Sequence, residues 1–171
     1  TILSNTPNNP TSLNQWRNSL LTQPIATGGG ASSTPIYITM TMEVTGISGG
    51  TLYPQVEYKP IGTAFSCSGL TSCASATEGT GVAGPGPIDC SLTANNCAIP
   101  ISPTDNVYHW QSRVCHNKGG THTASCSGTG DYPGSWVSFD VNAESATDFK
   151  IDSTPPVITL VGSGSPGTNN A

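Results

Sequence analysis

The most regular alternation of apolar and polar side chains runs over residues 36–44 and predicts a half-buried strand. Apolar residues occupy every second position there, and Tyr, Thr and Glu fill the positions between them. Successive side chains of a strand point to opposite faces, so this period places one face in a core. Residues 52–58 have the same period but contain Pro54, which favours an edge strand or a bulge. We expect these two segments to pair as a hairpin.

The segment around Trp110 carries the same alternation with aromatic residues. Tyr108, Trp110 and Val114 fall on its inner face. Short strands are also predicted at residues 136–139 and 148–151, and both contain aromatic side chains that can share one core with Trp110. The pattern therefore predicts an antiparallel β centre. Three polar residues fall between the inner positions and are expected to face outwards: His109, Gln111 and Arg113.

These segments resemble part of a known family. Residues 108–114 (YHWQSRV), 136–139 (WVSF) and 142–149 (NAESATDF) are similar to the C-terminal half of fibronectin type III-like modules in large prokaryotic secreted and surface proteins. A weaker similarity reaches back to residues 13–16, so the resemblance covers residues 13–152. It implies an antiparallel β-sandwich of the fibronectin type III or immunoglobulin-like kind, in which the aromatic residues are core and the module is a building block. The cysteine-bearing loops depart from that pattern.

Residues 60–103 are rich in Gly, Ser, Thr, Ala and Pro and contain few large apolar side chains. A structureless loop of that length is uncommon inside a compact domain. Short strands are therefore expected at residues 64–67 and 88–92. Near the N-terminus, residues 12–26 predict a first strand with an irregular middle, and a short helix over residues 13–21 is the competing interpretation.

The overall composition is that of a turn-rich all-β protein. Charged residues make up 9% of the chain, Gly 20 and Pro 14 are abundant, and no segment keeps a 3.6-residue apolar period. The net charge is −5 and only five residues are Lys or Arg, which argues against a nucleic-acid-binding surface. No apolar run reaches the roughly 20 residues that span a bilayer. The chain opens at Thr1 rather than at a methionine, so we expect a processed mature form or a fragment.

Six cysteines fall into three local pairs. Six cysteines allow fifteen connectivities, and we expect adjacent pairing because each pair brackets a Gly-, Ser- or Asn-rich segment that can turn back. Each closure would stabilise the fold by about 2–3 kcal/mol. Such cysteine usage indicates an oxidising compartment, hence a secreted or cell-surface protein. The expected disulfides are Cys67 with Cys73, Cys90 with Cys97, and Cys115 with Cys126.

Both ends of the chain are predicted to be extended arms, residues 1–12 before the domain 13–152 and residues 153–171 after it. Two consecutive prolines open the C-terminal arm and fix an extended entry. The β-prone residues that follow could add to the sheet edge of another copy and give a head-to-tail homopolymer. Residues 1–3 are the other candidate, and folding back onto the same domain is the alternative. The expected polymerisation strand is Val157, Ile158, Thr159, Leu160 and Val161.

Two sets of residues have the composition of a chemical site. Ser138 with His109 and either Asp140 or Asp148 would supply a nucleophile, a base and an orienting acid, but the G-x-S-x-G pattern is absent. We therefore expect no enzymatic activity. The other set offers zinc ligands, but its C-H-x5-H-x3-C spacing is not a known finger pattern, and an oxidising compartment favours a disulfide. We expect no metal or cofactor at this second set: Cys115, His116, His122 and Cys126.

Carbohydrate binding needs exposed aromatic platforms on a sheet face or at a loop tip. The candidates are Trp16, Tyr37, Tyr53 and Tyr132, and Tyr132 lies in the turn-like residues 131–134. Aromatic residues make up only 6% of the chain, and most are explained by core packing. Tyr132 is the expected glycan contact if the protein binds a sugar.

The sequence thus predicts one secreted, disulfide-stapled β-sandwich of about seven strands between two arms. The expected function is a non-enzymatic structural subunit of an extracellular filament, pilus-like fibre or cell-surface assembly. Its partners would be other copies or neighbouring modules, joined by strand exchange. The alternative is a carbohydrate-binding or adhesive module. The predicted core is Ile36, Ile38, Met40, Met42, Val56, Tyr108, Trp110, Val114, Trp136 and Phe149.

Overall fold

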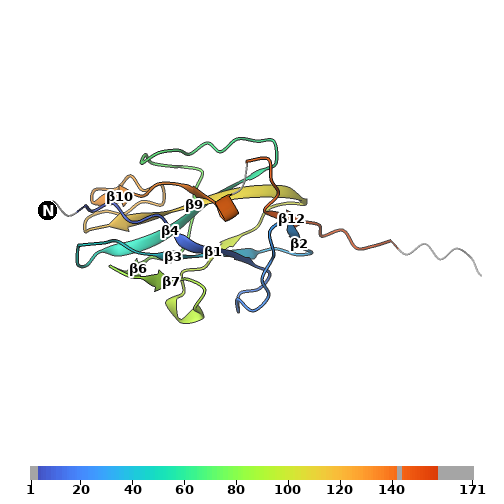
Figure 1. Ribbon diagram of the computed structural model, residues 1–171, viewed down its shortest axis with the longest axis horizontal. Helices are drawn as coiled ribbons and strands as arrows, with labels where there is room; N and C mark the ends of the chain where they lie inside the picture. The colour runs from blue at the N-terminus through green and yellow to red at the C-terminus, as the bar shows by residue number, and fades with distance from the viewer. Residues whose placement is uncertain (1–3, 142–143, 158–171) are drawn as a thin grey trace, which may run out of the picture.

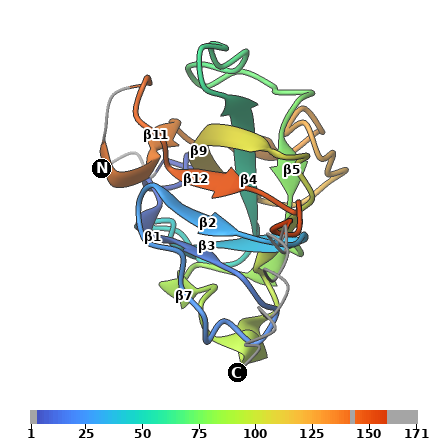
Figure 2. The same cartoon turned by 90° about the vertical axis from the view of Figure 1, so that its right-hand side faces the viewer.

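The computed structural model describes residues 4–141 and 144–157, which fold into two β-sheets packed face to face (Figure 1, Figure 2). In the described residues, no helix is long and apolar enough to cross a membrane. The smaller sheet contains β1 (Thr11–Trp16), β3 (Ile36–Met42), β7 (Ile88–Asp89) and β8 (Ile99–Ile101). The larger sheet contains β2 (Gly29–Ala31), β4 (Thr51–Pro60), β5 (Thr77–Glu78), β6 (Val82–Ala83), β9 (Asn106–Asn117), β10 (Asp131–Pro133), β11 (Val137–Ser138) and β12 (Phe149–Ile151). Two 3-10 turns, η1 (Thr93–Asn95) and η2 (Phe139–Val141), complete the elements.

The antiparallel ladder between β4 and β9 is the longest strand pairing of the larger sheet. It runs from the pair Thr51–Asn117 to the pair Pro60–Tyr108. β5 and β6 pair with the other side of β4, so the prediction that Pro54 marks an edge strand or a bulge is wrong. The Gly79 N–H donates to the Pro54 carbonyl at 2.9 Å on that side. The nitrogen of Pro54, which has no proton, therefore faces the gap between β5 and β6, where no strand needs it.

The predicted hairpin between residues 36–44 and 52–58 does not form, because β3 and β4 belong to different sheets. Gly46, Gly49 and Gly50 adopt φ values of 83°, 77° and 90°, which only glycine adopts readily, and the connection crosses from one sheet to the other. Each strand has one apolar face. Placing the strands in opposite sheets lets these faces cover each other in a single core.

The apolar core between the sheets contains nearly all the residues predicted for it. Ile36, Met40 and Trp110 are fully buried, and the Trp110 ring stacks on Phe139 with centroids 4.7 Å apart. Trp136 is the exception, because it is only partly buried and lies on the other face of the larger sheet. The buried core is Ile25, Ala31, Ile36, Ile38, Met40, Met42, Val44, Leu52, Val56, Ile88, Cys90, Cys97, Ile99, Ile101, Tyr108, Trp110, Val114, Phe139, Phe149 and Ile151.

Tyr108 fixes the start of β9. Its hydroxyl donates to the Thr104 carbonyl at 2.8 Å, and its ring stacks on Phe149 with centroids 5.2 Å apart. Beside it, the Asp148 carboxylate accepts a hydrogen bond from the Trp110 backbone N–H at 2.8 Å. These contacts hold β12 against β9 and orient the aromatic core.

The remaining sequence predictions are mixed. Residues 64–67 form no strand, and the short strands lie instead at β5, β6 and β7, the last within the predicted 88–92. β1 ends at Trp16 and is followed by turns, so the competing helix over residues 13–21 does not form.

Candidate functional site

The outer face of the larger sheet is covered by two loops, residues 61–76 and 118–130, each closed by a disulfide. The prediction that His109, Gln111 and Arg113 face outwards into solvent is therefore wrong. Their exposed fractions are 3%, 6% and 0%. The described cysteines form the adjacent pairs Cys67–Cys73, Cys90–Cys97 and Cys115–Cys126, and none of them is free.

Glu57 on β4 anchors the first of these loops. Its carboxylate accepts hydrogen bonds from the Ser66 N–H at 2.8 Å, the Cys67 N–H at 3.2 Å and the Gln111 amide at 2.9 Å. Burial alone would raise the pKa of Glu57, but the hydrogen bonds from Ser66, Gln111 and Cys67 outweigh it and lower the pKa below its usual value. The carboxylate is therefore ionised and serves as a fixed acceptor for the loop backbone.

Arg113 on β9 ties both loops to the sheet. Its guanidinium donates to the Gln55 side chain at 2.7 Å, to the Thr71 carbonyl at 2.5 Å and to the Ser125 carbonyl at 3.3 Å. The guanidinium Cζ lies over the Trp136 ring, 4.6 Å from its centroid. Burial lowers the pKa of Arg113 to about 10, against the attraction of Glu78. The group stays charged at neutral pH, and its donors satisfy loop carbonyls instead of water.

His122 closes the second loop between two carboxylates. Its Nδ1 and Nε2 lie 2.8 Å from Asp131 and 2.8 Å from Glu78, and its ring stacks on Tyr53 at 3.6 Å between centroids. Both contacts require a proton on each nitrogen, which is the imidazolium form. Burial alone would lower the pKa of His122, but hydrogen bonds and attraction to Asp131 and Glu78 outweigh it and raise the pKa. His122 thus connects its own loop to Glu78 of β5 and Asp131 of β10.

The four residues whose side chains are of the zinc-ligand type are each held by other partners. Cys115 and Cys126 are joined in a disulfide, so neither provides a thiolate. His116 donates through Nδ1 to the Asn5 carbonyl at 2.7 Å, and His122 is held by its carboxylates.

The residues considered as a nucleophile, base and acid also form hydrogen bonds with other groups and not with one another. The ring of His109 bonds the Thr63 carbonyl at 2.8 Å, and Asp140 accepts from the Thr27 hydroxyl at 3.0 Å. Asp148 is engaged by the Trp110 backbone. Within the described residues no hydrogen bond joins Ser138 to His109.

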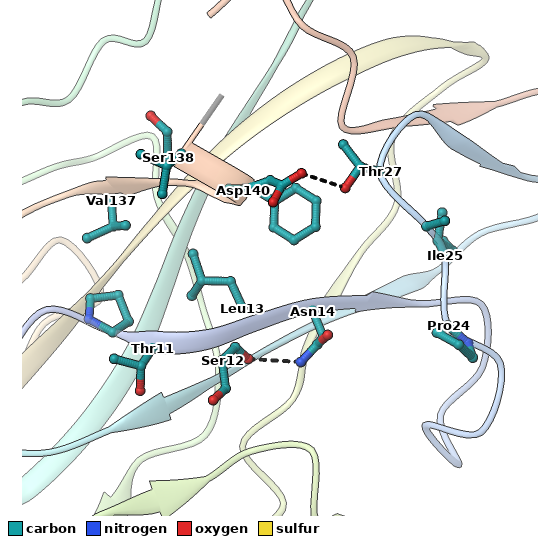
Figure 3. A pocket seen from close by; sticks show the side chains of 14 residues that line it. Thr11, Ser12, Leu13, Asn14, Pro24, Ile25, Thr27, Val137, Ser138 and Asp140 are labelled. Atoms are coloured by element: carbon teal, nitrogen blue, oxygen red, sulfur yellow. Dashed lines mark hydrogen bonds between the residues drawn. The ribbon is translucent and has the colours of Figure 1, made fainter. Parts of the chain in front are cut away.

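A groove of about 550 Å³ lies between the sheets, beside the outer edge of β1 (Figure 3). Leu13 from β1 and Val137 from β11 point toward one another across it. β1 pairs with β3 on one side, and on the other side only its end meets residues 24–25. No strand of the described chain pairs with the outer edge of residues 11–14. The groove is lined by residues 10–14, 24–27 and 137–141.

Three of the six described non-glycine residues with positive φ line this groove. Ser12, Asp140 and Val141 adopt φ values of 50°, 54° and 52°, in the left-handed region. For residues with a Cβ this conformation costs about 1–2 kcal/mol each. Strained residues persist where the surrounding structure imposes them, often at ligand-binding sites. Val141 is also 90% exposed, although it is apolar.

The two arms differ in how they meet the domain. Residues 4–10 lie across the seam between the sheets, where Asn8 bonds the Glu43 carbonyl at 2.9 Å and Asn5 accepts from His116. At the other end, Ser153 is held by the exposed Asp105, and residues 152–157 are exposed throughout. Of the predicted polymerisation strand, only Val157 is described, with an exposed fraction of 88%, and residues 158–161 lie outside the described residues.

The candidate sugar platforms are dispersed. Tyr132 lies in β10 opposite His116, not at a loop tip, and Tyr53 is covered by His122. Trp16 and Tyr37 are cross-strand partners, and the Trp16 indole donates to the Thr39 hydroxyl at 2.9 Å.

Comparisons with protein-family models, with curated proteins and with solved structures found no match. The sequence pattern does not single out Glu57 and Arg113, whose side chains anchor the two loops. The signal that could identify them is a charged residue within a predicted strand of a chain with cysteine-closed loops. If such a loop covers the strand, the charged side chain is buried and needs a partner.

Proposed function

We propose that the protein is a non-enzymatic structural subunit of an extracellular assembly, whose copies join head to tail through the C-terminal segment. One observation carries this proposal. The chain leaves the domain as exposed residues 152–157, at the end of the long axis opposite the N-terminal segment (Figure 1). When a segment that extends from one end of a domain binds the next copy, the same contact can repeat head to tail and give a linear polymer. Three disulfides support an oxidising location outside the cell.

We also propose that the domain is of the fibronectin type III-like kind. The partition of strands supports this, with β1, β3 and β8 in one sheet and β4, β9 and β12 in the other. A second support is the Tyr108 hydroxyl, which bonds the backbone four residues upstream, at the start of β9. This contact resembles the tyrosine corner of immunoglobulin-like sandwiches. Such modules serve as building blocks, in agreement with the structural role.

The C-terminal segment suits the role of donor better than the N-terminal arm. Residues 4–10 are already bound to their own domain through Asn5 and Asn8, so donating them would break hydrogen bonds to His116 and Glu43. Residues 154–157 form no such contacts with a sheet. The sequence of residues 157–161 is rich in β-branched residues and carries no charge, which favours a strand when it pairs with a sheet edge.

The acceptor in this proposal is the groove beside β1. A strand from a second copy would add to the unpaired outer edge of residues 11–14, where backbone hydrogen bonds supply affinity. Its apolar side chains would meet Leu13 and Val137 between the sheets. The segment's own domain is a poor acceptor, because residues 152–157 run away from it along the long axis (Figure 1).

Size-exclusion chromatography with light scattering and negative-stain electron microscopy test the assembly. The full chain is expected to elongate with concentration, and a version ending at Asp152 to stay monomeric. Val141→Lys places a charge at the groove without touching the core and is expected to prevent assembly. Leu92→Lys is the matched control, because Leu92 is 57% exposed but lies away from the groove.

Monomers at all concentrations for the full chain would reject the structural-subunit proposal, and glycan screening would then follow. Assembly that needs the C-terminal segment but tolerates Val141→Lys would keep the donor and reject the groove as acceptor.

A further inference from the structure

His109 lies beside a second cavity, on the outer face of the larger sheet. This cavity has a volume of about 330 Å³ and is lined by residues 61–64, His109 and residues 144–145. The His109 side chain is 4% exposed, and its ring stacks on Phe65 with centroids 4.3 Å apart. The ring is therefore fixed in orientation by its packing.

The hydrogen bond of His109 determines which nitrogen carries its proton. Nε2 lies 2.8 Å from the Thr63 carbonyl oxygen, which only accepts hydrogen bonds. Nε2 is thus the donor, and in the neutral ring Nδ1 presents a lone pair. Nδ1 is buried and makes no hydrogen bond to any described residue.

The nearest charged group to Nδ1 is the Glu144 carboxylate, with Oε2 at 3.3 Å. Two acceptors that face each other at this distance are stabilised by a cation between them. Lys59, the cross-strand partner of His109, does not fill this place, because its ammonium lies 3.5 Å from Glu57. The Glu144 side chain is 58% exposed, so the site opens to solvent on its side.

We propose that His109 Nδ1 and the Glu144 carboxylate bind one divalent transition-metal ion of the zinc type. Imidazole nitrogen and carboxylate oxygen are zinc ligands at about 2.1 Å, and a ligand separation of 3.3 Å then gives an angle of about 104° at the metal, near the tetrahedral value. Metal-binding histidines usually donate their other N–H to a carbonyl or carboxylate, as His109 does to Thr63. The other ligands of such an ion would be water molecules, which can reach it from the exposed side of Glu144.

Calorimetric titration of the full, disulfide-intact chain with Zn²⁺, without a histidine tag, tests the site. One ion per chain is expected to bind at this site, and Glu144→Gln is expected to weaken its binding about tenfold or more. Asp152→Asn removes the same charge from another exposed position and is expected to leave binding unchanged. In long-range ¹H–¹⁵N spectra of the imidazoles, Zn²⁺ should shift Nδ1 of His109 while Nε2 stays protonated.

Two results would overturn the proposal. The first is the absence of saturable Zn²⁺ binding, which would mean that a proton rather than a metal ion joins the pair. The second is binding that Glu144→Gln leaves unchanged, or that shifts the resonances of His122 instead of His109. None of these outcomes depends on whether the protein polymerises.

Discussion

The two faces of the larger sheet are stabilised by different interactions. On the inner face, side chains such as Trp110 and Val56 are buried among apolar neighbours, where shape and volume decide stability. On the outer face, Glu57, Gln111 and Arg113 are buried to the same degree, but each bonds the backbone of a disulfide-closed loop. A loop with few apolar residues can therefore be ordered when the strands beneath it supply buried hydrogen-bonding groups.

The largest expected loss comes from the inner face. Trp110→Ala removes a fully buried indole that stacks on Phe139 and donates to Gln15 at 3.0 Å. The free energy of unfolding is expected to fall by about 3–5 kcal/mol, measured by denaturant titration with the disulfides intact. Trp136→Ala on the outer face is the control and should cost less than half as much, because Trp136 is partly exposed. Equal losses would contradict the placement of these two residues.

On the outer face, Arg113→Met conserves length and apolar contact but removes the guanidinium donor from the Gln55 and Thr71 acceptors. The Ser125 carbonyl loses one of its two donors and keeps the Cys73 N–H. We expect a loss of about 2–4 kcal/mol, because buried acceptors that lose a charged partner are costly. Hydrogen exchange should rise in both loops, residues 61–76 and 118–130. Lys150→Met, at the one exposed position of β12, is the control and should change neither stability nor exchange in the two loops. Faster exchange in only one loop would show that Arg113 does not join them.

The sequence predicted the inner face well and the outer face poorly, for one physical reason. A period of two identifies the strand positions that share a face, and Ile36, Met40 and Trp110 follow it. The period does not reveal what covers the other face. The cover consists of residues 61–76 and 118–130, which have no apolar period of their own, so the burial of Arg113 follows only from tertiary structure.

Two smaller errors have similar causes. Trp136 was expected in the core because it is aromatic, but the register of β11, with Val137 opposite Ser112, puts it on the outer face beside Arg113. The hairpin was expected because β3 and β4 are adjacent in the chain, whereas Gly49 and Gly50 carry the connection to the opposite sheet. The groove beside β1 is formed by residues from both sheets, so the sequence pattern of a single strand does not predict it.

The disulfide of the second loop is the next test of the outer face. Replacing Cys115 and Cys126 together by Ser reopens an 11-residue separation, and the chain-entropy estimate for such a closure is about 3 kcal/mol. We expect exchange to increase mainly in residues 118–130, with the β3 amides of the inner face protected until global unfolding. An equal increase at β3 would show that the loop and the apolar core form one cooperative unit.

The smallest effect distinguishes the two loops by pH. The pKa of His122 is raised above its usual value in the folded protein by Asp131 and Glu78, although burial opposes this. A raised pKa means that the imidazolium stabilises the fold below the unfolded pKa of about 6.5, and that this stabilisation is lost as the pH rises through the folded pKa. Neutral His122 can donate to only one of its two carboxylates.

Exchange in residues 118–130, corrected for its intrinsic pH dependence, should therefore increase as the pH rises above about 6.5 and through the raised pKa of His122. The increase should be equivalent to about 1–2 kcal/mol for the lost charged hydrogen bond. Residues 61–76 are the internal control. Their anchor Glu57 has a lowered pKa, because hydrogen bonds from Ser66 and Gln111 outweigh burial, so its stabilisation is lost only as the pH falls through that pKa, well below this range. His122→Gln should abolish the change in the second loop and leave the first untouched. A parallel change in both loops would mean that the outer face responds as one layer, through Arg113, rather than as two separately anchored loops.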